Sequence, residues 1–215
     1  HSLAIWATLW PASLFLLPGL AYAVITARSR NASRLSRSMR LALCWAVPFW
    51  FLIEFMPTKL PHYGLPVFPA LCLIIGAAVI AMGRSAGFKT TRLIGGIGFL
   101  IGTGLLIGAM IFVQTQHGAS GQILGVTIIC GVSIFAALFA FAALMTDRLR
   151  KAVAAAVISA VVYFIGAYGW VLPNLPDFKT SERVFAELQS FGPRPASAAL
   201  HSPHYREPSL VYYAG

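Results

Sequence analysis

The stretch Leu93–Val113, LIGGIGFLIGTGLLIGAMIFV, decides the fold of this chain. It contains 21 residues and no charged side chain. A helix of roughly 20 apolar residues, rising about 1.5 Å per residue, crosses the hydrocarbon core of a bilayer. The whole chain has the same character, with 58% hydrophobic and 10% charged residues, whereas soluble domains carry about 25% charged residues. This composition excludes an ordinary soluble enzyme and also a disordered chain, which would need low hydrophobicity and high charge.

Five further apolar runs accompany this stretch, at 3–27, 41–56, 67–83, 122–145 and 152–172. We therefore predict an all-α integral membrane protein in which residues 1–172 form a bundle of six transmembrane helices, with 93–113 as the fourth. The tail at 173–215 differs in composition. Its residues 181–188 have the pattern of a short amphipathic helix, and 209–213 have the pattern of a strand, so we expect the start of a small α/β part there.

The charge distribution predicts the orientation of the bundle. The net charge is +10, and eleven Lys and Arg residues lie in alternate loops, at 28–40, 84–92 and 146–151. The opposite loops, 57–69 and 114–121, contain Lys59 alone. Cytoplasmic loops of membrane proteins collect Lys and Arg, so we expect the basic loops in the cytoplasm, and the N-terminus and tail on the periplasmic side. The excess of positive charge is then explained by the orientation of the helices in the membrane. We therefore expect no nucleic-acid partner.

The glycines of the fourth run form two pairs at the spacing that lets helix backbones approach closely, Gly98 with Gly102 and Gly104 with Gly108. We expect them to serve tight packing within the bundle. A homodimer contact is the alternative.

One carboxylate, Glu54, lies inside a predicted membrane run. A charge at membrane depth is costly and is by default a functional candidate. The alternative is that Glu54 sits near the outer interface and pairs with Lys59.

The segment 57–69 is dense in proline and carries three candidate ligands for a lipid phosphate. Its four prolines oppose a regular helix, and irregular chain at a membrane surface tends to line a cavity. Lys59 offers a cation, and His62 and Tyr63 offer donors on apolar bodies. The alternative is an interfacial anchor of a snorkelling lysine and a tyrosine of the aromatic belt.

Residues 59–71, KLPHYGLPVFPAL, resemble a segment of bacterial membrane glycosyltransferases of the dolichyl-phosphate-mannose–protein mannosyltransferase superfamily, which includes the aminoarabinose transferases of lipid A. The tail stretch 207–215, EPSLVYYAG, resembles the family's stretch after its last helix. The resemblance implies a C-type glycosyltransferase fold, a polyprenyl-phosphate sugar donor, and transfer to a lipid or protein acceptor on the periplasmic face of the bacterial inner membrane. Lys59 and Tyr63 match loop positions that help to hold the donor's phosphate.

The chain departs from this family in one respect. The family's catalytic carboxylate lies in its first outer loop, and no outer loop before residue 173 contains an acidic residue. We therefore expect the C-terminal-half membrane region of a larger enzyme, inactive by itself, with Glu54 as the remaining candidate base. We expect no cofactor in this region, and a divalent metal in the full-length enzyme is left open. The alternatives are a membrane protein that binds a lipid phosphate without catalysis, and a fragment of a transporter.

Overall fold

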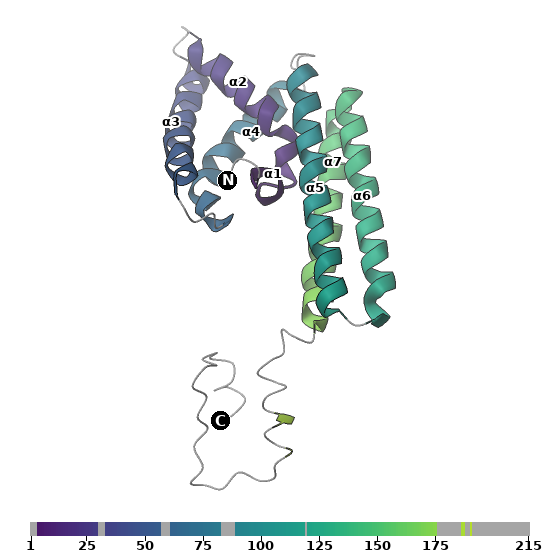
Figure 1. Cartoon of the computed structure of the whole chain (residues 1–215). Helices are drawn as coiled ribbons and strands as arrows, with labels where there is room; N and C mark the ends of the chain where they lie inside the picture. Colours follow the sequence, from purple (N-terminus) through teal and green to yellow (C-terminus); the bar gives the residue numbers. More distant parts are fainter. Residues whose placement is uncertain are drawn as a thin grey trace, which may run out of the picture.

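A computed structural model of the chain describes residues 4–29, 33–56, 61–82, 89–118 and 120–175, together with Ala186, Glu187 and Ser190 (Figure 1). Within these residues the chain is helical or in turns, and they contain no strand. The elements in chain order are α1 (Ile5–Thr8), η1 (Ala12–Phe15), α2 (Leu16–Arg28), α3 (Arg34–Glu54), η2 (Pro61–Val67), α4 (Phe68–Met82), α5 (Lys89–His117), η3 (Ser120–Gln122), α6 (Ile123–Met145), α7 (Leu149–Gly166), η4 (Ala167–Val171) and η5 (Leu172–Asn174). Apart from Ala186 and Glu187, the predicted tail helix at 181–188 and the predicted strand at 209–213 lie outside the described residues.

Four helical segments are long and apolar enough to cross a membrane, namely His62–Met82, Lys89–Gln116, Ile123–Met145 and Leu149–Asn174. They coincide with four of the six predicted runs, those at 67–83, 93–113, 122–145 and 152–172. The chain is therefore a multi-pass membrane protein, and the part that the structure describes is helical.

The first predicted run, 3–27, is not a single helix. The chain makes one turn of helix in α1, turns at Leu9–Pro11, and continues through η1 into α2. Pro11 explains the break, because proline lacks an N–H donor and its ring clashes with the preceding helical turn. The stretch Ala12–Arg28 is apolar but shorter than the four long segments.

The second predicted run, 41–56, belongs to a helix that begins seven residues earlier. Ser33 caps α3, because its hydroxyl accepts a hydrogen bond from the N–H of Ser36 at 3.1 Å. The first two turns of α3 therefore carry Arg34, Arg37 and Arg40. Their charges leave α3 outside the set of four apolar segments, although its second half is the apolar stretch that the sequence indicates.

The helices form two groups that lie side by side (Figure 1). In one group, α5, α6 and α7 run alongside one another, and small residues line the interface of α6 with α7, where the hydroxyl of Ser159 donates to the backbone oxygen of Ser133 at 2.8 Å. The other group contains α1 to α4. The indole N–H of Trp10 joins the groups by donating to Oγ1 of Thr103 on α5 at 2.9 Å. Small residues and interhelical hydrogen bonds are the means by which membrane helices associate.

The C-terminal ends of α2 and α4, the N-terminal ends of α3 and α5, and the α6–α7 connection gather at one end of the bundle (Figure 1). Nine of the eleven cations that the sequence places in the basic loops belong to the described residues at this end, namely Arg28, Arg34, Arg37, Arg40, Lys89, Arg92, Arg148, Arg150 and Lys151. The opposite end holds the C-terminus of α3, the start of η2 and the α5–α6 connection. The fold thus brings together the loops that the charge count groups. We call these the basic end and the opposite end.

The two glycine pairs of α5 have different surroundings. A Cβ atom added at Gly102 would lie 2.2 Å from the backbone oxygen of Trp6, and one added at Gly98 would lie 2.3 Å from the Trp6 ring. This pair confirms packing within the bundle, because it lets α1 lie directly on α5. At Gly104 and Gly108 an added Cβ would meet nothing within 4 Å, so the second pair faces outward.

Candidate functional site

The candidate site lies at the opposite end of the bundle, where α3 finishes and η2 leads into α4. Glu54 is the last residue of α3 and is half-buried. His62 and Tyr63 lie in the first turn of η2. Lys59 lies outside the described residues. The fold therefore brings η2 against α3 and α4, and places three of the four predicted residues on adjoining elements.

The proline-rich segment is more regular than the sequence suggests. Residues Pro61–Val67 form a 3₁₀ helix that continues directly into α4, so the predicted irregular chain is wrong for this part. Proline fits here because its fixed φ of about −65° suits a 3₁₀ turn, and the tight i→i+3 pattern differs from the α-helix in which an internal proline clashes. The polar side chains of η2 consequently belong to a regular helical element.

His62 and Tyr63 form an edge-to-face pair, with ring centroids 4.8 Å apart and ring planes at 77°. His62 is exposed, whereas Tyr63 is half-buried. An edge-to-face contact is a favourable arrangement of two aromatic rings. The pair thus offers an imidazole and a phenol from one place at the end of the bundle.

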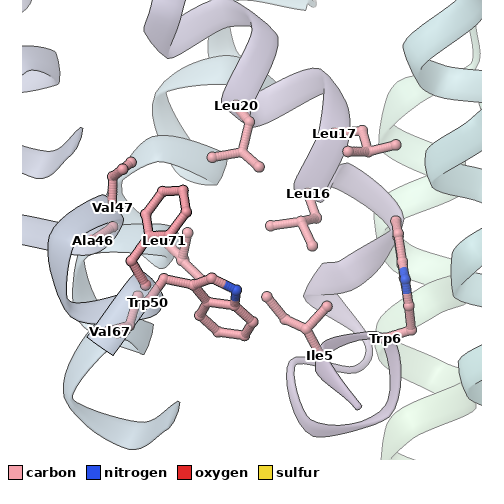
Figure 2. Close-up of a pocket in the computed structure, with 11 residues that line it drawn as sticks. Ile5, Trp6, Leu16, Leu17, Leu20, Ala46, Val47, Trp50, Val67 and Leu71 are labelled. Carbon is pink, nitrogen blue, oxygen red and sulfur yellow. The ribbon is translucent and has the colours of Figure 1, made fainter. Parts of the chain in front are cut away.

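An apolar cavity of about 370 Å³ adjoins this segment (Figure 2). Val67 at the end of η2 and Leu71 of α4 form part of its wall, and Trp50 extends from α3 toward Ile5 and Leu16 on the other side. The remaining lining residues are Trp6, Leu17, Leu20, Ala46, Val47 and Phe51. The volume falls within the range of about 300–1,000 Å³ that is typical of small-molecule sites.

The polar residues Glu54 and Tyr63 belong to elements that also line the cavity. Glu54 follows Trp50 by four residues, so both side chains lie on one face of α3. Tyr63 belongs to η2, whose last residue Val67 lines the cavity. The arrangement places polar groups from the ends of α3 and η2 beside an apolar space. It can hold an amphiphile whose head group lies among polar side chains and whose chain lies among apolar ones.

The sequence did not indicate most residues of the cavity wall. Ile5 and Leu16 reach it because the chain breaks at Pro11, and Trp50 reaches it because of the packing of α2 on α3. Pro11 indicates in the sequence that the helix breaks there. The direction of the chain after the break depends on tertiary packing and cannot be read from the sequence. Over the described residues there is no group of three or more His, Cys, Asp or Glu side chains that could hold a metal ion.

Comparisons with protein-family models, with curated proteins and with solved structures found no match to this chain. The family resemblance therefore rests on the residues of 59–71 and 207–215, of which the structure describes 61–71.

Proposed function

We propose that this chain is part of a polyprenyl-phosphate-sugar-dependent glycosyltransferase that acts at the periplasmic face of a bacterial inner membrane. The observation that carries the proposal is the apolar cavity next to η2, because η2 holds half of the motif that resembles the transferase superfamily. A polyprenyl-phosphate sugar is an amphiphile of the kind that such a site accommodates. The cavity receives the start of the isoprenoid chain, and the polar residues face the phosphate.

The proposed topology has six membrane crossings. In this arrangement α1 to α2 form the first crossing and α3 the second, and the four long apolar segments complete the six. The basic end faces the cytoplasm, and the opposite end, with Lys59, His62 and Tyr63, faces the periplasm. The clustering of nine described cations at one end supports this orientation.

The proposed reaction is an inverting transfer. The acceptor hydroxyl attacks the anomeric carbon, a carbon–oxygen bond forms, and the bond from that carbon to the phosphate oxygen breaks. Polyprenyl phosphate is the leaving group, and the sugar is transferred to the acceptor. Lys59 offsets the charge that develops on the departing phosphate, and Tyr63 orients that group. The acceptor's proton passes to a carboxylate, and the family's catalytic carboxylate has no counterpart among the matched residues of this chain.

Orientation is tested by cysteine labelling in intact cells, in a background that lacks Cys44, Cys72 and Cys130. Because Ser33 lies at the basic end, we expect Ser33→Cys to resist a membrane-impermeant maleimide until the cells are opened. We expect Ser120→Cys, in the α5–α6 connection, to react in intact cells. The reverse pattern would place the η2 end in the cytoplasm and exclude periplasmic transfer.

The role of the cavity is tested by filling it. Leu20 lines the cavity and is half-buried, so Leu20→Trp occupies part of the space. Displacing about two methylene groups of the lipid, at ~0.8 kcal/mol each, should weaken binding of polyprenyl phosphate by roughly tenfold. Calorimetric titration in detergent micelles measures the affinity.

The matched control for this titration is Leu73→Trp, because Leu73 lies on the exposed face of α4 and outside the cavity. It should bind polyprenyl phosphate as the wild type does. If both variants bind with wild-type affinity, the cavity does not hold the lipid, and the proposed site loses its main support. If wild-type protein also binds polyprenol without its phosphate equally well, the polar end of the site has no role.

A further inference from the structure

A second cavity lies at the basic end, far from the residues of the transferase motif in the bundle. It has a volume of about 380 Å³ and lies where α5 begins and α6 gives way to the α6–α7 connection. Lys89, Thr90 and Arg92 of α5 line one part of it, and Asp147 of the connection lines another. These residues have no role in the proposed transfer reaction.

Arg92 is a buried cation on the wall of this cavity. Only 5% of its surface is exposed, and its Nη1 donates to Oδ1 of Asp147, which is the ion pair that joins α5 to the α6–α7 connection. Its Nε is buried and has no hydrogen-bond partner among the described residues. A buried charged donor without an acceptor is costly, so this atom calls for an acceptor oxygen. The rigid fork of a guanidinium suits the oxygens of a phosphate.

Asp147 does not satisfy the positive charge of the cavity. It pairs with Arg92, and it is the one acidic residue among those that line the cavity, so no lining carboxylate remains to offset Lys89. It lies at the turn between α6 and α7 with φ at 57°, a left-handed conformation that Asp adopts more readily than most residues. With Lys89 and Arg92 positive and Asp147 negative, the lining residues keep a net charge of +1.

The first turn of α5 adds neutral donors to these cations. Lys89 and Thr90 open a helix of 29 residues, whose first N–H groups have no partner within the helix. The helix dipole favours an anion at this position. The Thr90 hydroxyl supplies a further donor.

Apolar side chains complete the wall of the cavity. Leu93 comes from α5, and Leu144 and Met145 come from the last turn of α6. A free inorganic anion would gain no binding energy from these apolar side chains. A lipid would contact both parts of the wall, with its head group among the cations and its acyl chains on the apolar side. The cytoplasmic leaflet is rich in anionic lipids, and the basic loops gather at this end of the bundle.

We propose that this cavity binds the phosphate group of an anionic glycerophospholipid, with Arg92 as the central ligand and Lys89 and Thr90 beside it. The lipid would bridge the start of α5 and the end of α6. The proposal needs no sugar donor and concerns the other end of the bundle, but its choice of lipid rests on the proposed orientation with the basic end in the cytoplasm.

The test is a lipid titration of the whole chain in neutral detergent micelles, followed by native mass spectrometry. Dioleoyl-phosphatidylglycerol, dioleoyl-phosphatidylcholine and inorganic phosphate are the three probes. We expect phosphatidylglycerol to bind at least fivefold more tightly than phosphatidylcholine. Lys89→Gln should weaken phosphatidylglycerol binding about fivefold, because it removes one exposed cation near the head group. Arg92→Lys should weaken it about tenfold, since it keeps the charge and loses the fork.

The matched control is Lys151→Gln, which removes the same charge at the basic end, from the first turn of α7, outside the cavity. It should change the affinity less than twofold. An equal loss with Lys89→Gln and Lys151→Gln would overturn the site in favour of diffuse attraction to the basic end. Equal binding of the two lipids would also overturn it, and so would inorganic phosphate that displaces phosphatidylglycerol at millimolar concentration. Because Lys89 is exposed, its variant keeps the test valid even where Arg92→Lys unfolds.

Discussion

Replacing Lys59 with alanine should weaken the binding of polyprenyl phosphate by roughly 10- to 150-fold. A hydrogen bond to a charged group contributes about 1.5–3 kcal/mol, and this range converts to that change in affinity. No neighbouring cation can substitute, because Lys59 is the only Lys or Arg of the loops 57–69 and 114–121. Calorimetric titration of the purified chain with polyprenyl phosphate measures the loss. Folding should hardly change, because a lysine in a loop at a membrane interface contributes little to helix packing.

Two further variants show whether the effect of Lys59→Ala is local. Lys59→Arg keeps the charge and should retain part of the affinity. Lys151→Ala removes a cation at the basic end and should leave polyprenyl phosphate binding as it was. If Lys59→Ala binds the lipid phosphate normally, Lys59 is an interfacial anchor, and the assignment of the phosphate site to the η2 end fails.

The sequence predicts the long apolar helices because one physical requirement dominates them. Each must satisfy its own backbone groups across about 30 Å of hydrocarbon, which leaves a run such as Leu93–Val113 little choice of structure. The same requirement does not determine where a helix starts or breaks. Ser33 begins α3 ahead of the apolar run by capping it, and Pro11 interrupts the first run. Both residues can be read from the sequence. Where each helix then begins and in which direction it runs depends on the helices packed around it.

In the candidate site, too, the sequence indicates one part and not the other: it indicates the polar residues but not the apolar cavity. The polar residues could be chosen as candidates from the sequence, because Glu54, His62 and Tyr63 are rare residue types beside apolar runs. The cavity could not, because its walls are ordinary aliphatic and aromatic residues from five elements between Ile5 and Leu71. The second cavity was hidden for a related reason. Arg92 and Asp147 are 55 positions apart, and a loop charge in the sequence gives no sign that its side chain becomes buried.

Gly102→Ala should destabilise the bundle by about 1–3 kcal/mol, the usual loss when a methyl group is forced into a packed site. The added Cβ would lie 2.2 Å from the backbone oxygen of Trp6, and because a backbone atom cannot rotate away, α1 would have to lift off α5. Gly104→Ala is the matched control, two residues along the same helix, where an added Cβ meets nothing within 4 Å. It should leave stability unchanged or raise it slightly, since alanine is the better helix former. Reversible unfolding in mixed micelles compares the free energies. Equal stability of the two variants would mean that α1 does not rest on α5, and the cavity wall at Ile5 would then lose its support.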